Sequence, residues 1–341
     1  MSPVLDCFIP GLNPPPDEEG ATWLRPEETP WLNRWLQRHP PSAVRNDPAQ
    51  DAQARLLPGT VVRASAAWLA ECQSQPALAT APTATLPTGS SLAFLHPVHL
   101  QAGIDTAVVL GERFLALTPD ERRAFETDLR AFLAEDALHL LTAPSGRWYL
   151  AIPPDSPLGD AALPPLGEAL NRSAQSFFEG DERRALRRWL TELQMWLYSH
   201  PVNAERARRG QPEMNSLWLW ARSPFPATVN PAATPGAGTL FTDLPSLAGC
   251  WPGRSQLIDS RAIESLIEAI QQNPESPLHL VWTEPAYALL EGDFAGWQQA
   301  LRTVEQCLAS LPAGWRSRIR LDTGAGARAL PGWRNLWGRL G

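Results

Sequence analysis

One stretch of the sequence concentrates side chains that could bind an anion. It runs from His200 to Ser223 and reads HPVNAERARRGQPEMNSLWLWARS. The candidate ligand-binding residues in it are His200, Asn203, Arg206, Asn215, Ser216 and Trp218. Arginine forks, side-chain amides and a histidine that converge near a strand end suit the binding of a phosphate or a carboxylate. A second interpretation stays open, in which the asparagines bond to backbone in turns, Pro201 fixes the turn, the arginines are solvated and the tryptophans lie in the core.

Regular elements on both sides are expected to position this stretch. A helix is predicted from about Asp181 to Ser199, because its apolar residues recur every three or four positions and form one stripe. These residues are Leu186, Trp189, Leu190, Leu193, Trp196 and Leu197. A strand is predicted at SLWLWA, which begins at Ser216, and a proline turn is expected between the helix and this strand.

The chain before that helix predicts a compact α+β unit. Strands are expected at Ser91–His96 and Thr106–Gly111, and two more at AEDALHLLTA and RWYLAIP. Thr118 is a good N-cap with Glu121 three residues later, which predicts a helix that continues through Leu133.

Helices and strands alternate in the C-terminal third of the chain. The predicted elements are a helix at 260–272, a strand at 278–283, a helix at 294–311 and a strand at 318–323. Alternation of this period favours an α/β fold with a parallel sheet, and we expect the two strands to lie next to each other in it.

Composition excludes several functions. The chain contains no lysine, so all 29 basic residues are arginine, and a Schiff-base, Walker-A or protein-kinase lysine is impossible. The net charge of −7 argues against nucleic acid as a partner. No stretch approaches the roughly 20 apolar residues of a membrane span, and the N-terminus lacks the pattern of a signal peptide, so no membrane association and a cytoplasmic location are expected.

Other polar candidates are interpreted as structural. The four cysteines are far apart, which is typical of buried thiols in a reducing compartment rather than of a zinc site or a disulfide framework. They are Cys7, Cys72, Cys250 and Cys307. His96 and His99 have no acidic residue nearby in the sequence, so a structural role is favoured for both.

The His200 stretch resembles a known family. HPVN, followed by Arg206, Gly210 and a Pro-x-x-Asn before a hydrophobic strand, is similar to HPVNxxRxxxGxxPAN of archaeal-type cofactor-independent phosphoglycerate mutases. It is more similar to bacterial RpfE-type regulatory proteins, in which the strand reads NSLWLWG. Leu278–Leu311 resembles a mutase stretch in which a strand, an Asp-Glu-Ala-Gly-His motif and a Gly-Asp lead into a long helix. The block LHPVHLQAGIDTAVV, with the helix after Thr118 and the strand RWYL, resembles the domain inserted into the mutase core.

The resemblance implies an organisation for the whole chain. It implies an alkaline-phosphatase-like α/β core with a mostly parallel sheet, formed by residues 1–90 and 200–341. Residues 91–199 are then expected to form the inserted α+β domain and its connecting helix.

The resemblance also implies chemistry that this sequence does not match. The mutases use two divalent metals and a phosphoryl-accepting serine, and a two-metal site needs several converging carboxylates and imidazoles. Asp6 could stand at the first metal aspartate, but Ala286–Leu290 occupy the acid and histidine positions of the later motif. Asp322 is followed by no histidine, and the last histidine of the chain is His279.

We therefore expect no catalytic residue, no metal site and no cofactor. The leading hypothesis is a non-catalytic, metal-free phosphoglycerate-mutase-like protein with a regulatory or ligand-binding role, whose ligand is a small phosphorylated or carboxylated molecule. The alternative is an active cofactor-independent phosphoglycerate mutase that holds Mn or Zn through relocated ligands.

The C-terminal tail GWRNLWGRLG is the candidate surface for a protein partner. It carries Trp333 and Trp337 beside Arg334 and Arg339, in a chain that has 15 tryptophans. Tryptophan and arginine are enriched at interaction hot spots. Two alternatives remain open: the tail packs across the edge of the core sheet, or it forms a partner or self-association surface.

Overall fold

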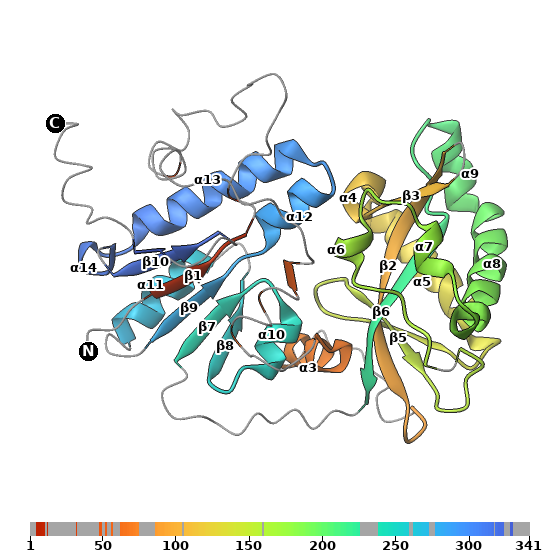
Figure 1. Cartoon of the computed structure of the whole chain (residues 1–341), viewed down its shortest axis with the longest axis horizontal. Coiled ribbons are helices and arrows are strands. Elements are labelled where there is room, and N and C mark those ends of the chain that lie inside the picture. Colours follow the sequence, from red (N-terminus) through yellow and green to blue (C-terminus); the bar gives the residue numbers. More distant parts are fainter. Residues whose placement is uncertain are drawn as a thin grey trace. The chain divides into compact units, whose positions relative to one another are not determined.

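The computed structural model divides the chain into two compact units (Figure 1). The first, here the α/β unit, combines Met1–Val61 with Val229–Gly341, and the second, the inserted unit, is Val62–Thr228. The structure describes residues 5–10, 12, 32, 48–49, 52, 56, 62–74, 86–103, 106–158, 160–225, 238–258, 262–272, 277–316, 318–323 and 328–329. The predicted tail surface with Trp333 and Trp337 lies outside the described residues.

The α/β unit contains a mostly parallel sheet, as predicted. Its order is β11 (Arg328–Ala329), β10 (Ile319–Asp322), β1 (Leu5–Phe8), β9 (Leu278–Val281), β7 (Thr239–Thr242) and β8 (Arg254–Leu257). Only the β10–β11 pair among these is antiparallel. The predicted direct pairing of β9 with β10 is wrong, because β1 pairs with both and separates them. Three of the four β1 residues are buried, which suits a central strand.

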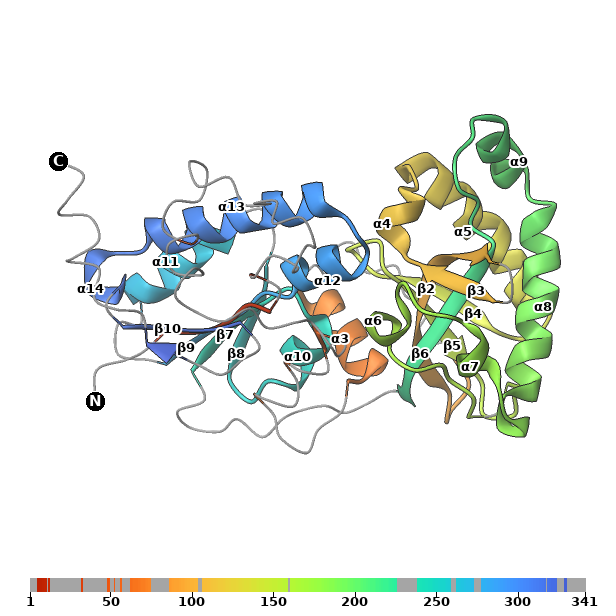
Figure 2. The ribbon, with the colours of Figure 1, turned by 45° about the horizontal axis from the view of Figure 1, so that its top comes forward.

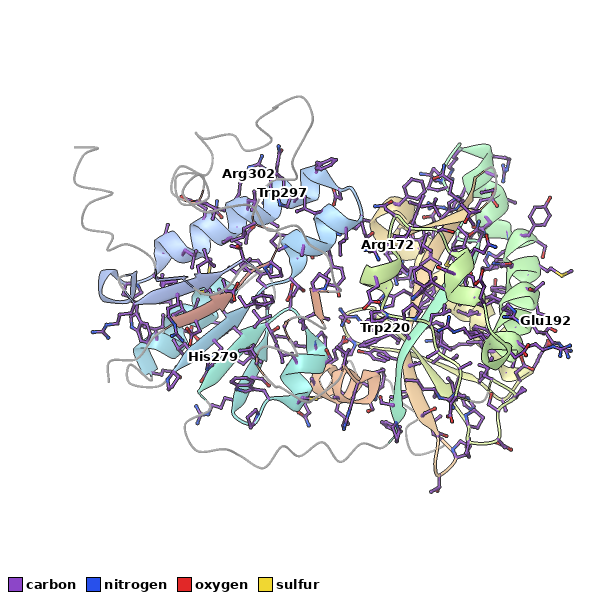
Figure 3. The ribbon with its side chains drawn as sticks, viewed as in Figure 1. Arg172, Glu192, Trp220, His279, Trp297 and Arg302 are labelled. Atoms are coloured by element: carbon purple, nitrogen blue, oxygen red, sulfur yellow. The ribbon has the colours of Figure 1, made fainter. Side chains whose placement is uncertain are left out.

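Helices of the α/β unit follow the predicted alternation. They are α10 (Pro245–Cys250), α11 (Ala262–Gln272), α12 (Glu284–Leu290), α13 (Phe294–Ser310) and α14 (Ala313–Arg316). The longest of them, α13, buries Trp297, Leu301 and Val304 in the same core as strand residues Leu5 and Leu278, and Trp297 is labelled in Figure 3. The buried face of α13 therefore packs on the parallel sheet and holds it in place.

The inserted unit is built on an antiparallel sheet. The long strand β2 (Ser91–Ala102) pairs with β3 (Ala107–Leu110), β5 (Trp148–Ile152) and β6 (Ser216–Pro224), and β4 (His139–Thr142) pairs with β5. The division of the chain differs from the predicted core of 1–90 plus 200–341, because β6 pairs with β2 from Ser91↔Pro224 to Val98↔Ser216. This pairing places the whole predicted ligand-binding stretch in the inserted unit.

The described helices of the inserted unit include the two that the sequence predicts, after Thr118 and before His200, and several that it does not (Figure 2). They are α3 (Ala64–Ser74), α4 (Glu112–Leu115), α5 (Pro119–Ala134), α6 (Leu166–Ala169), α7 (Gln175–Phe178), the 3-10 turn η2 (Asp181–Arg183), α8 (Arg184–Tyr198) and α9 (Pro201–Arg208). Thr118 and Glu121 form the predicted capping box of α5. The α8 stripe is buried except for Trp196, which is half-buried. No described helix is both long and apolar enough to cross a membrane.

Candidate functional site

His200 caps the N-terminus of α9, a helix where the sequence predicted only a turn. Its Nδ1 accepts a hydrogen bond from the Val202 backbone N–H at 3.2 Å, and its Nε2 lies 3.1 Å from Asp128 Oδ2. Because Nδ1 accepts, the proton of the neutral ring is on Nε2 and is donated to Asp128. The ring stacks on Phe125 at 4.5 Å. Burial lowers the pKa of His200, although the Asp128 carboxylate opposes this shift.

Asn203 joins the end of α8 to the segment before β6. Its amide nitrogen donates to the carbonyl groups of Leu197 and Met214, each at 2.8 Å, and its Oδ1 accepts from the Met214 N–H at 3.0 Å. Asn203 is buried, and these three hydrogen bonds replace those that its amide group would make with water. Asn203 therefore fixes the loop between α9 and β6.

Arg206 is a buried cation whose donors are used inside the unit. Nε donates to the Pro212 carbonyl at 2.7 Å, Nη1 to Glu121 Oε2 at 2.7 Å, and Nη2 to the Leu115 carbonyl. Its side chain is 1% exposed and that of Glu121 is 13% exposed. Burial alone would raise the pKa of Glu121, but the Thr118 hydrogen bonds and the Arg206 charge lower it. The guanidinium thus ties α9 to α5.

Asn215 and Trp218 are also held by backbone partners. Asn215 Oδ1 accepts from the Leu100 N–H at 2.7 Å while its amide donates to the Leu100 carbonyl at 3.0 Å. Trp218 Nε1 donates to the Pro164 carbonyl at 2.8 Å. Ser216 is buried at the start of β6. The side chains of Asn215 and Trp218 therefore bond this part of the chain to Leu100 on β2 and to Pro164.

The structure brings the six predicted residues into one unit and gives most of them internal partners. His200, Asn203, Arg206, Asn215 and Trp218 each bond to backbone or to a carboxylate of the inserted unit. These contacts favour the folding interpretation of the stretch over a preformed anion site. The predicted solvation of its arginines is wrong for Arg206, because its side chain is 1% exposed and its guanidinium donates to three acceptors of the inserted unit.

Asp6, which stands where the resemblance expects the first metal aspartate, is part of an ion pair. Its Oδ1 lies 2.5 Å from Nε of Arg320, which occupies the facing position on β10. The hydrogen bond and charge of Asp6 raise the pKa of Arg320. The positions expected for the later acid and histidine motif, Ala286–Leu290, lie in α12.

A second carboxylate of the α/β unit, Asp243, was not singled out from the sequence. It follows β7 directly and accepts hydrogen bonds from the N–H groups of Thr283 and Glu284, both at 2.8 Å, and from the Thr283 hydroxyl. Burial raises the pKa of Asp243 to about 7, against the effect of these donors. Its position directly after a parallel strand could have identified Asp243 from the sequence, because the carboxyl ends of parallel strands meet at one edge of a sheet.

Within the described residues, no group of three or more His, Cys, Asp or Glu side chains is arranged to hold a metal ion. Two of the four cysteines, Cys7 and Cys307, are buried as predicted, whereas Cys72 and Cys250 are only partly buried.

His96 has the acidic partner that the sequence did not reveal. Its Nδ1 lies 3.1 Å from Glu112 Oε1, and Arg122 Nη2 lies 2.6 Å from Glu112 Oε2. Burial alone would raise the pKa of Glu112, but His96 and Arg122 lower it to about 2. Glu112 therefore stays ionised and orients the imidazole.

Comparisons with solved structures give distant neighbours, including these two. One is a cofactor-independent phosphoglycerate mutase from Thermoplasma acidophilum DSM 1728, with 18% identity, a TM-score of 0.33, and coverage of 94% of this chain and 86% of that chain. The other is the PH0037 protein from Pyrococcus horikoshii, with 12% identity, a TM-score of 0.38, and coverage of 94% and 81%. No family model and no curated protein matches the sequence.

Proposed function

We propose that the protein is a non-catalytic, metal-free relative of the cofactor-independent phosphoglycerate mutases, with a regulatory or ligand-binding role. One observation carries the proposal: the aspartate at the first expected metal position, Asp6, is engaged by Arg320.

The Asp6–Arg320 pair opposes a dication in two ways. Asp6 and Arg320 face each other in the register of neighbouring strands, so the sheet itself holds the guanidinium beside the carboxylate. A metal bound to Asp6 would have to compete with a charge-assisted hydrogen bond and would lie close to a second cation. The pair is half-exposed and contributes little to stability. Its main effect is that Arg320 neutralises the negative charge with which Asp6 would bind a metal ion.

The other acidic candidate in this unit also has internal donors. Asp243 directs both oxygens at Thr283 and at the start of α12. A two-metal centre needs several carboxylates and imidazoles at once. The internal donors of Asp6 and Asp243 therefore support the proposal of a metal-free protein.

Metal content tests the proposal directly. Purified wild-type protein and Arg320→Gln are incubated with Mn²⁺ or Zn²⁺, desalted and analysed by mass spectrometry for metal. We expect substoichiometric metal in the wild type. Stoichiometric metal in the wild type would contradict the proposal, whereas metal gained only by Arg320→Gln would support the blocking role of Arg320.

Ligand binding has a separate test with 3-phosphoglycerate as the probe. A ligand at 100 times its dissociation constant stabilises the folded state by about 2.7 kcal/mol. Because Arg206 is buried among internal acceptors, we expect equal stabilisation of wild type and Arg206→Ala. A shift confined to the wild type, in an Arg206→Ala variant whose circular dichroism spectrum shows that it is folded, would place Arg206 in the ligand site. No shift in either would remove phosphoglycerate as a ligand.

A further inference from the structure

Two large apolar side chains are exposed together on the outer face of α8 in the inserted unit. Met195 is 70% exposed and Tyr198 is 83% exposed. They are three residues apart, so their side chains are neighbours on one face of the helix. In both ribbon views α8 lies along the outer margin of the unit (Figure 1, Figure 2). Methionine and tyrosine are enriched in protein interfaces, so this pair indicates a surface that binds a partner.

The same face of α8 carries arginines nearer its start. Arg184 and Arg188 are exposed and lie in line with Met195, because residues four and seven apart share a helix face. Arg188 Nε lies 3.0 Å from an oxygen of Glu192, which is labelled in Figure 3. The Arg184 side chain makes no hydrogen bond or ion pair with the part of the chain that the structure describes. Residues 181–209 contain seven arginines and four acidic residues, although the whole chain has a net charge of −7.

The physics of the helix does not account for Arg184 and Arg188. The N-terminal end of a helix is the positive pole of its dipole, where a cation is unfavourable, and the first turn of α8 has no acidic residue. Like charges four residues apart also repel each other. Arg187 has an internal role, because it donates to the carbonyls of Phe178 and Gly180. The charge of Arg184 is left for a group outside the unit.

We propose that the outer face of α8, defined by Arg184, Arg188, Met195 and Tyr198, binds an acidic amphipathic segment of another protein. Carboxylates of the partner pair with the arginines, and an apolar side chain of the partner packs on Met195 and Tyr198. At a rise of about 1.5 Å per residue, Arg184 lies about 16 Å from Met195 along the helix axis. The acidic and apolar groups of the partner must be separated by a similar distance.

Other polyanionic partners fit this face less well. A helix that binds a lipid surface inserts a whole apolar face, whereas the apolar stripe of α8 is buried inside the unit and leaves only Met195 and Tyr198 outside. Nucleic acid is disfavoured by the net charge of −7. The proposal does not depend on whether the protein is catalytic or binds a metal.

Methionine methyl resonances test the proposal in the full chain. The sequence has three methionines, Met1, Met195 and Met214, and buried Met214 is the matched control in a ¹³C-methyl-methionine spectrum. The Met195 signal is assigned from its loss in Met195→Leu. The probe is a helical peptide of about 18 residues, with glutamates in its first two turns and leucine and tryptophan in its last two. We expect a saturable shift of the Met195 signal and no shift of the Met214 signal.

A charge variant separates binding from folding. Arg184→Glu should raise the peptide dissociation constant about fivefold to tenfold. It should not lower the unfolding temperature, because an acidic residue suits the first turn of a helix and can pair with Arg188 four residues later. The matched control is Arg123→Glu on α5, where the side chain is 68% exposed. This control should leave the dissociation constant within about twofold of the wild-type value.

Four results would overturn the proposal. The first is the absence of a saturable Met195 shift at about 1 mM peptide, and the second is equal peptide affinity of Arg184→Glu and wild type. The third is a Met195 response to phosphatidylglycerol vesicles or to a single-stranded oligonucleotide at lower concentration than to the peptide. The fourth is a wild-type dimer that Met195→Glu dissociates, because the outer face of α8 would then be a contact between two copies of the chain.

Discussion

Replacing Arg206 by alanine should destabilise the inserted unit strongly. The substitution removes three hydrogen bonds and leaves the Glu121 carboxylate and the carbonyls of Pro212 and Leu115 without their cation. Breaking a buried ion pair by deleting one partner costs about 3–5 kcal/mol. Glu121 also accepts from the Thr118 N–H in the capping box of α5, so the lost contact weakens that helix start as well.

Urea unfolding followed by far-UV circular dichroism measures this cost. The matched control is Arg209→Ala at the end of α9, because the Arg209 side chain is 59% exposed and pairs with Glu205 four residues earlier on the helix surface. Such a pair is worth about 0.3–0.5 kcal/mol. Arg206→Lys should fall between the two, since an ammonium keeps the charge but cannot reach all three acceptors.

A loss of less than about 1 kcal/mol of unfolding free energy in Arg206→Ala, or a loss no larger than that in Arg209→Ala, would contradict this expectation. Either result would mean that water or a rearranged side chain replaces Arg206 between α5 and α9. The folding interpretation of the HPVN stretch would then lose its main support.

Three further perturbations test other parts of the structure. Because burial lowers the pKa of His200 below about 6.5, the neutral imidazole cap stabilises the inserted unit above that pH and this stability is lost as the pH falls; urea titrations should show a steeper loss in the wild type than in His200→Gln. Burial raises the pKa of Asp243 to about 7 in the folded state, whereas an unfolded-state aspartate has a pKa of about 3.9. The stability contributed by the protonated form is therefore fully present below about pH 3.9 and is lost as the pH rises through about 7. Asp243→Asn should raise the unfolding temperature more at about pH 8 than at about pH 5. Gly238 has a φ of +74°, and the Cβ added by Gly238→Ala would clash with the Pro277 carbonyl oxygen. Gly292 has a φ of +71°, but nothing lies within 4 Å of its added Cβ, so Gly292→Ala should lose about 1–2 kcal/mol of unfolding free energy. Denaturant titrations should show a larger loss for Gly238→Ala than for Gly292→Ala.

Local patterns in the sequence predicted the helices α5, α8, α11 and α13 and the strands β2 to β6, β9 and β10. Thr118 and Glu121 predicted the start of α5, and the stripe from Leu186 to Leu197 predicted the buried face of α8. Both signals depend on neighbours within one or two helical turns. The alternation in the C-terminal third likewise predicted the parallel sheet.

Long-range pairing was not predictable in the same way. Four residues, Leu5–Phe8, separate β9 from β10, and nothing local to either strand indicates it. The assignment of β6 to the inserted unit depends on its pairing with β2, more than 100 residues earlier.

The candidate site was predicted as a set of residues but not as a set of contacts. The burial of Arg206 depends on Glu121 and on the carbonyl of Leu115, which lie on other elements. His96 acquires its acidic partner, Glu112, only when α4 packs beside β2. Residue type indicates which groups can bind an anion, and the fold decides whether their donors are still available.

Turnover of 3-phosphoglycerate tests the central claim most directly. ³¹P NMR of the full-length protein with 3-phosphoglycerate and Mn²⁺, followed over hours, detects even slow formation of 2-phosphoglycerate. Because Arg320 engages Asp6, we predict no conversion above that of a protein-free sample. Conversion that rises in proportion to protein concentration and is abolished by EDTA would contradict the account and identify an active, metal-dependent mutase.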